Sequence, residues 1–173
     1  MKKREGLVQV YTGNGKGKTT AAIGLAIRAS GAGLKVYIMQ FIKAKIYSEI
    51  KALALLDNIT VEQCGLGCFI RGKPKKSDLE AAKRGLEKAR RRVVSGKFDV
   101  IILDEINIAL SLGLIRERDA KGLINAKPKY AEMVLTGRYC PKSLIERADL
   151  VTEMRELKHP YQRGIKARRG IEF

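Results

Sequence analysis

Short apolar runs alternate with amphipathic stretches along the whole chain. Apolar runs bounded by glycine, proline or polar clusters are typical of buried strands, whereas apolar residues spaced three and four apart predict helices. The runs that predict strands are 6–11, 36–41, 59–61, 100–103, 133–136 and 150–154. The stretches that predict helices are 18–30, 48–56, 77–93, a short one from Asp119 to just before Pro128, and one that opens at Pro141.

The helical pattern is strongest in two of these stretches. In 77–93, Ser77 and Glu80 match a capping box, and apolar residues recur along one face. In 18–30, small apolar residues form one face, and the stretch closes with two glycines. The apolar positions are Leu79, Ala82, Leu86, Ala89 and Val93 in the first and Ala21, Ala22, Leu25, Ala26 and Ala29 in the second.

This alternation of strands and helices predicts the fold class. Right-handed crossovers between strands give a mostly parallel central sheet with helices on both faces. The chain has 173 residues, the size of about one domain, and it contains no repeat and no Pro- or Ser-rich linker. We therefore expect a single α/β domain over residues 1–173.

A glycine-rich loop at residues 12–20 joins the first predicted strand to the first predicted helix and reads TGNGKGKTT. In this context successive backbone N–H groups wrap a phosphate chain, Lys18 neutralises charge, and the Thr19 hydroxyl reaches Mg²⁺. The loop departs from the usual GxxxxGK[ST] pattern in one place, because Thr12 stands at the first glycine position and the glycine has moved to Gly13. The loop predicts a P-loop NTPase (RecA-like) domain that binds a nucleoside triphosphate.

Asp104 and Glu105 supply a second candidate group, since they follow directly on the apolar run 100–103. An acidic residue that ends such a strand lies at the carboxyl edge of the sheet, where open α/β folds bind ligands. Asp104 can hold Mg²⁺ there, or it can simply cap the next helix. The P-loop does not by itself fix the reaction, because hydrolases, kinases and transferases all use it.

The chain is strongly basic. It has 35 Lys and Arg against 18 Asp and Glu, a formal net charge of +17, which indicates anionic partners. A P-loop ATPase that binds RNA or DNA is therefore an alternative function, and a non-catalytic nucleotide-binding module is a third. Nucleic-acid modules interleave aromatic residues for stacking, whereas aromatic residues make only 6% of this chain and Trp is absent. The basic clusters are 73–76, 88–92 and 166–169.

Several classes are excluded by composition. No apolar stretch approaches the length of about 18 residues that a membrane span requires, and the N-terminus does not read as a signal peptide. Cys64, Cys68 and Cys140 are odd in number and indicate reduced thiols in the cytoplasm. A zinc site at the first two would need two further ligands, and His159 is the only histidine.

Beyond the loop, ordered sequence blocks resemble a known family. The run from Tyr11 to Ala22 is similar to the P-loop of the ATP:corrinoid adenosyltransferases, the P-loop enzymes that act on cobyrinic acid a,c-diamide and cobalamin. The other matching blocks are QFIK (40–43), LDEIN (103–107), LTGR (135–138), DLVTEMRE (149–156), KH (158–159) and GIKA (164–167). These blocks keep their order over essentially the whole chain.

The resemblance implies a reaction and its components. ATP donates its 5′-deoxyadenosyl group to the cobalt(I) of a reduced corrinoid and releases inorganic triphosphate, with the phosphates lying on the loop in the unusual sense. Mg²⁺ (or Mn²⁺) is the implied metal, a reduced flavoprotein is the implied electron donor, and a homodimer is the implied assembly. The tail 158–173 is a candidate lid over the site.

The resemblance also assigns site residues. Lys18, Thr19, Glu105 and Arg138 are the candidate catalytic residues, and Thr19 with Asp104 is the candidate metal site. Arg138 either binds a phosphate with its guanidinium or forms a surface salt bridge without a role in the reaction. Asn107 either contacts the nucleotide or caps a helix. Phe69 either contacts the corrin or packs as an ordinary core or loop residue. The candidate substrate-binding residues are Thr12, Gly13, Asn14, Gly15, Lys16, Gly17, Lys18, Thr19, Thr20, Asn107 and Phe69.

Overall fold

A central sheet of six parallel strands organises the chain, as described by a computed structural model that covers residues 5–67 and 72–173. The strand order is β3-β2-β4-β5-β1-β6, and every pairing in it is parallel. The predicted α/β class is thus confirmed. The strands are β1 (Val8–Thr12), β2 (Val36–Gln40), β3 (Ile59–Gln63), β4 (Val100–Asp104), β5 (Glu132–Thr136) and β6 (Leu150–Glu153).

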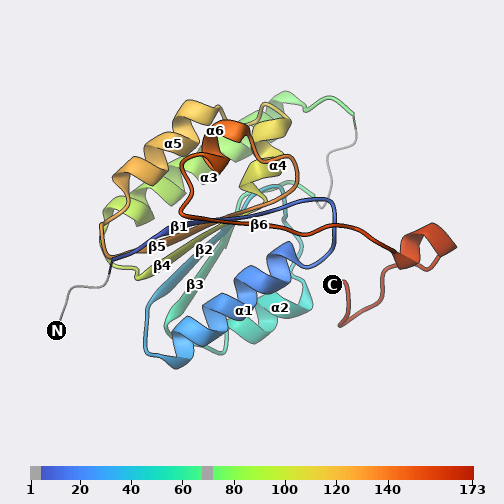
Figure 1. The fold of residues 1–173 in the computed structure, drawn as a ribbon, viewed down its shortest axis with the longest axis horizontal. Helices are drawn as coiled ribbons and strands as arrows, with labels where there is room; N and C mark the ends of the chain where they lie inside the picture. The colour runs from blue at the N-terminus through green and yellow to red at the C-terminus, as the bar shows by residue number, and fades with distance from the viewer. Residues whose placement is uncertain (1–4, 68–71) are drawn as a thin grey trace.

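Helices cover both faces of this sheet, as the alternating pattern predicts (Figure 1). On one face lie α1 (Lys18–Gly31) and α2 (Ser48–Leu53). The opposite face carries α3 (Lys76–Val94), α4 (Ile106–Ser111), α5 (Glu117–Ala126) and α6 (Lys142–Ile145), and a 3₁₀ turn, η1 (Pro160–Arg163), follows β6. Over the described ranges, no helix combines the length and apolarity needed to cross a bilayer.

Alternate residues of the strands build two apolar layers. On β2, Ile38 packs into the layer beneath α1, and Tyr37 and Met39 pack into the layer beneath α3. Ala22 and Ala26 of α1 are fully buried against the first layer, so the small residues let this helix approach the sheet closely. Packing on both faces therefore holds the sheet, and with it the ends of the strands, in place.

The start of α3 differs from the prediction. The helix begins at Lys76, and the Asp78 carboxylate accepts the backbone N–H of Lys75 at 2.8 Å. The predicted capping box of Ser77 and Glu80 is wrong, because the N-cap is Lys75 and Ser77 already lies within the first turn of the helix. Asp78 and Glu80 are both carboxylates near the helix start, and sequence spacing alone does not show which of them accepts the N-cap N–H.

Two further helix starts were not predicted correctly. The short helix α4 follows β4 with a single residue between them, Glu105, which turns the chain with a positive φ of 60°. Such a conformation is uncommon for a residue other than glycine, so the pattern gave no turn signal there. Pro141 precedes α6 as its N-cap and does not occupy the first helical position.

Strand register brings the candidate site together at the carboxyl edge of the sheet. Gln40 of β2 lies beside Asp104 of β4, and Leu103 lies beside Leu135 of β5, so that Thr136 comes next to Asp104. The P-loop leaves the same edge, since it follows directly on β1. Groups far apart in sequence therefore converge on one end of the sheet, as expected for an open α/β fold.

Candidate active site

The glycine-rich loop lies between β1 and α1, as predicted. Gly17 has a φ of 117°, and α1 begins at the next residue, so the unpaired N–H groups of its first turn face the loop. The buried Lys18 ammonium donates to the Gly15 carbonyl at 2.6 Å. Burial lowers the pKa of Lys18, and the nearby Arg138 charge lowers it further. The loop is therefore a preformed cationic cradle for an anion.

The loop packs tightly against the chain that follows β6. The Gly15 N–H donates to the Met154 carbonyl at 2.7 Å. Gly13 has a φ of 94°, and a Cβ at this position would lie 2.4 Å from the same Met154 oxygen. This contact explains why glycine stands at position 13, since only a residue without a Cβ can take this conformation against that backbone.

We expect Gly13→Ala to weaken both the fold and ATP binding. The added Cβ clashes with backbone and holds a strained φ, which costs at least about 2 kcal/mol of unfolding free energy. Urea unfolding and calorimetric titration with ATP measure the two effects. Gly24→Ala is the control, because no atom lies within 4 Å of a Cβ there and the site is an exposed helix position. That control gains about 0.5–1 kcal/mol from helix propensity. Equal stability of the two variants would contradict the expectation.

Asp104 is the centre of a hydrogen-bond network at the end of β4. Its side chain is 1% exposed. One carboxylate oxygen accepts the hydroxyls of Thr19 at 2.8 Å and Thr136 at 2.7 Å. The other accepts the Gln40 amide at 3.0 Å and the Lys43 ammonium at 2.9 Å. Four donors from three segments thus hold a buried negative charge, and the predicted pair of Thr19 and Asp104 does meet in space.

Glu105 lies next to this network but in a different environment. Its backbone N–H donates to the Thr136 hydroxyl at 3.0 Å, which holds the residue in its left-handed conformation. Burial raises the pKa of the Glu105 carboxyl, and the neighbouring Asp104 charge raises it further. Lys43, Lys18 and Arg138 oppose this rise. The side chain is therefore a second carboxylate beside the loop, held among three cations.

Arg138 and Asn107 belong to one corner of the site. Arg138 is exposed, and its charge acts on both Lys18 and Glu105, while its contact with a phosphate stays a prediction. Asn107 is fully buried inside α4, where its amide donates to the Gly137 carbonyl at 3.2 Å. Asn107 therefore does not cap a helix; it supports the turn that carries Arg138, and direct contact with nucleotide stays a prediction.

The remaining residues of the loop differ in how exposed they are. Thr12 is buried, and its hydroxyl accepts the Cys140 N–H at 3.4 Å. Asn14 and Thr20 are exposed, and Asn14 opens into a polar cavity of about 570 Å³. The residues that line this cavity are Asn14, Arg138, Tyr139, Glu153, Arg155 and Glu156. The open space on this side of the loop is thus bounded by charges of both signs.

The C-terminal tail returns to the loop. The Lys16 ammonium donates to the Ile171 carbonyl at 3.2 Å and pairs with Glu172 at 3.0 Å. The Phe173 ring contacts Tyr47, just before α2, with ring centroids 6.1 Å apart. In Figure 1 the tail passes outward through η1 and ends near α1 and α2. The tail thus reaches the phosphate loop, while its function as a lid stays a prediction.

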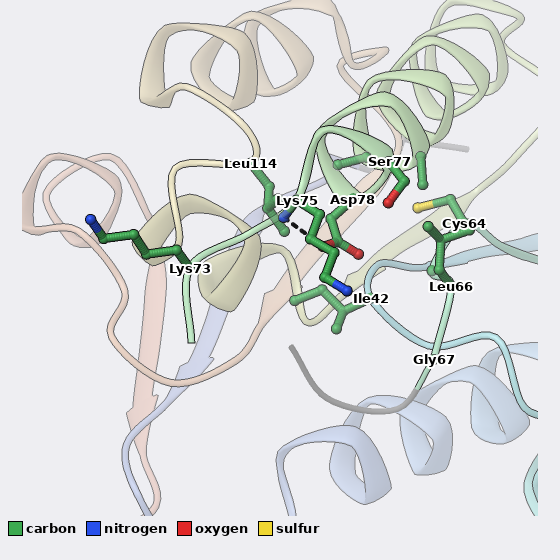
Figure 2. A pocket seen from close by; sticks show the side chains of 12 residues that line it. Ile42, Cys64, Leu66, Gly67, Lys73, Lys75, Ser77, Asp78 and Leu114 are labelled. Atoms are coloured by element: carbon green, nitrogen blue, oxygen red, sulfur yellow. Dashed lines mark hydrogen bonds between the residues drawn. The ribbon is translucent and has the colours of Figure 1, made fainter. Parts of the chain in front are cut away.

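A second cavity, of about 400 Å³, opens between the segment after β3 and the first turns of α3. Figure 2 shows Cys64 and Leu66 facing Ser77 and Asp78 across it, with Ile42 close by. Burial raises the pKa of the Cys64 thiol to about 11, so the thiol is protonated at neutral pH. The predicted corrin contact, Phe69, lies outside the described residues, as does Cys68.

Gln40, Lys43 and Thr136 are site residues to which the sequence assigned no role. All three lie within blocks that carry the family resemblance, which was the available signal. Their chemistry was hidden because an isolated Gln, Lys or Thr after a strand is common on any protein surface. Strand register brings Gln40 and Thr136 to one carboxylate, and the turn after β2 brings Lys43 there.

Comparison with known proteins agrees with this architecture. The family described as ATP:corrinoid adenosyltransferase BtuR/CobO/CobP matches residues 4–173. The chain belongs to this family. It is 33% identical over 168 residues to the corrinoid adenosyltransferase of Escherichia coli (strain K12), a match that covers 97% of this chain and 86% of the relative. The resemblance stated from the sequence blocks is therefore confirmed.

Other members of the adenosyltransferase family match as broadly. The corrinoid adenosyltransferase of Sinorhizobium sp is 37% identical over 173 residues, covering 98% of this chain and 81% of the relative. That of Pseudomonas aeruginosa is 34% identical over 170 residues, covering 97% and 84%. These matches favour the adenosyltransferase over the predicted alternative of an ATPase that binds nucleic acid.

The oxygen donors at the loop fit a magnesium ion. The Thr19 hydroxyl and the Asp104 carboxylate lie together, with the Glu105 carboxylate beside them. In the part of the chain that the structure describes, no group of three or more His, Cys, Asp or Glu residues is arranged to hold a metal alone. Mg²⁺ is usually held by one or two carboxylates together with substrate phosphates, so this donor set suits it.

Proposed function

We propose that this protein transfers the 5′-deoxyadenosyl group of ATP to the cobalt(I) of a corrinoid, cobyrinic acid a,c-diamide or cobalamin, and releases triphosphate. The observation that carries the proposal is the meeting of Lys18, Thr19 and Asp104 at the end of a glycine loop, in a chain of the adenosyltransferase family. The loop binds the triphosphate, and the open edge of the sheet leaves room for a second substrate.

The chemistry requires positioning and charge more than proton transfer. The cobalt(I) electron pair attacks the ribose C5′, the new bond joins cobalt to carbon, and the bond from C5′ to oxygen breaks. Its electron pair leaves on the triphosphate, and the cobalt is formally oxidised by two electrons. We assign Lys18, the loop N–H groups and Arg138 to the negative charge on this leaving group. No general base is needed, because the nucleophile carries no proton.

We propose that Thr19 and Asp104 hold Mg²⁺, with Glu105 beside them. When bound, the ion neutralises charge on the triphosphate that leaves. The predicted alternative, Mn²⁺, uses the same oxygen donors. Asp104 also fixes the orientation of the Thr19 hydroxyl, which donates to it.

We assign the corrinoid to the side of the site that carries the cavity beside Cys64. Ile42 lines the cavity, and the side chain of the next residue, Lys43, reaches the Asp104 network. Its lining combines apolar groups with Lys73 and Lys75, which suits an apolar ring with polar and anionic substituents. The role of Phe69 as a corrin contact stays a prediction.

The implied partners remain predictions as well. A reduced flavoprotein supplies the electrons for cobalt(I), and the protein acts in the cytoplasm as a homodimer. The open edge strand β6 supports the dimer, since Leu150 and Val151 are about two-fifths exposed there. Sedimentation equilibrium tests this, and a mass equal to that of the 19.2 kDa chain would contradict it.

A single assay tests the reaction. The purified protein is mixed with ATP, Mg²⁺ and chemically reduced cobalamin, and the spectrum is followed while inorganic triphosphate is assayed. We expect the cobalt(I) absorption to disappear with release of an equal amount of triphosphate. Release of ADP and phosphate with an unchanged corrinoid spectrum would make the protein an ATPase and overturn the proposal.

A further inference from the structure

Lys43 places an ammonium among the oxygens proposed to receive the metal. Its Nζ lies 2.9 Å from Asp104 Oδ2, 3.3 Å from Thr19 Oγ1 and 4.0 Å from Glu105 Oε1. The side chain is only 16% exposed. A lysine outside the P-loop therefore holds the same hydroxyl and carboxylate that the proposed function gives to Mg²⁺.

The backbone of Lys43 is anchored, so the side chain is the part that can move. The Lys43 N–H donates to the Phe41 carbonyl at 2.8 Å across a tight turn in which Ile42 has a φ of 70°. The Lys43 carbonyl accepts the Gly65 N–H at 3.0 Å. A Cβ on Gly65 would lie 1.9 Å from the Ile42 oxygen, so the glycine permits this close approach. These contacts fix the backbone from which the long, flexible, positively charged side chain of Lys43 extends.

An ammonium and a divalent cation cannot share these oxygens. Both are positive, and in a site of low dielectric their repulsion over a few ångströms is large. Asp104 keeps three of its four donors when the ammonium leaves, since Thr19, Thr136 and Gln40 still donate to it. Asp104 and Gln40 are almost fully buried, whereas the Lys43 side chain is partly exposed, so an ammonium that leaves Asp104 moves toward the open side of the site.

We propose that Lys43 is a positioning residue that exchanges partners during substrate binding. Without nucleotide, its ammonium occupies the cation position and neutralises Asp104. When Mg²⁺ and the triphosphate of ATP bind, it leaves Asp104 and donates to a triphosphate oxygen. The exchange opposes metal binding to the empty protein and favours metal and triphosphate together, so it couples the two ligands. This inference rests on the proposed function of the loop and of the metal site.

Two binding measurements on Lys43→Met test the exchange. The first follows free Mn²⁺ by electron paramagnetic resonance while the metal is titrated into the nucleotide-free protein. We expect the variant to bind Mn²⁺ about tenfold more tightly, because its competitor is gone. The second titrates inorganic triphosphate in excess Mg²⁺ by calorimetry. Here we expect binding about tenfold weaker, because one charge-assisted hydrogen bond is lost.

Opposite changes distinguish the exchange from a structural role. A substitution that only disturbs the fold lowers the affinity for both Mn²⁺ and triphosphate, and that result overturns the proposal. An unchanged affinity for Mn²⁺ overturns it as well. Lys43→Arg keeps the charge and should bind Mn²⁺ as weakly as the wild type. Lys45→Met is the matched control, since Lys45 is an exposed lysine two residues away. The affinities of this variant for Mn²⁺ and for triphosphate should equal those of the wild type.

The same measurements separate this inference from the proposed function. Wild-type protein that binds neither ATP nor inorganic triphosphate would contradict the function assigned to the loop. Wild-type protein that binds both and forms the adenosylated corrinoid, with Lys43→Met unchanged in both titrations, would overturn the exchange alone.

Discussion

Lys18→Ala should abolish triphosphate release, with a loss of at least about a thousandfold in turnover. The Lys18 ammonium is buried in the loop, where it donates to the neutral Gly15 carbonyl, and the nearby Glu105 and Asp104 charges offset only part of the effect of its burial. Burial has already lowered its pKa. A bound triphosphate supplies the negative charge that pairs with Lys18. The departure of triphosphate as a leaving group therefore depends on this cation.

The fold should survive this substitution. Lys18 gives up one hydrogen bond to Gly15 and a partly desolvated charge, and alanine is a good residue for the first turn of α1. Circular dichroism and thermal unfolding check this, alongside the assay for triphosphate. Lys97→Ala is a matched control, because Lys97 is an exposed lysine before β4 at the opposite edge of the sheet. Retained turnover in Lys18→Ala would remove the P-loop from the mechanism.

Asp104→Asn should lower both activity and stability. The carboxylate accepts four hydrogen bonds, whereas an amide has one oxygen and turns two N–H groups toward donors that need an acceptor. Leaving these groups unpaired in a buried site costs about 2–4 kcal/mol of unfolding free energy. We expect adenosyl transfer to fall at least about a hundredfold, because the charge that orients Thr19 and receives the metal is gone.

Urea unfolding and turnover per folded molecule measure these two effects separately. Asp99→Asn is the control at the other end of the same strand, where Asp99 accepts the Lys35 N–H at 2.9 Å in an exposed setting. That change should cost about 1 kcal/mol or less and leave turnover unchanged. An unstable Asp104→Asn that keeps full turnover when folded would limit Asp104 to a structural role.

Much of this site could be predicted from local sequence. A glycine-rich loop between a strand and a helix is contiguous, so Lys18 and Thr19 were identified from their neighbours alone. Asp104 was found because a carboxylate at the end of an apolar run stands at the carboxyl edge of a parallel sheet. Helix starts were harder to predict, since Ser77 and Asp78 are both good acceptors near a helix start and only the structure shows that Asp78 accepts the Lys75 N–H.

The alternation of strands and helices, the phosphate loop and the family could all be read from the sequence, because adjacent residues or ordered blocks encode them. The side chains that surround Asp104 could be identified only from the folded chain. Gln40, Lys43 and Thr136 come from the ends of β2 and β5, and the register of parallel strands brings them together. The ion pair between Glu172 of the tail and Lys16 of the loop is likewise visible only in the tertiary structure. Such contacts depend on how distant segments pack, and no local pattern in the chain encodes that packing.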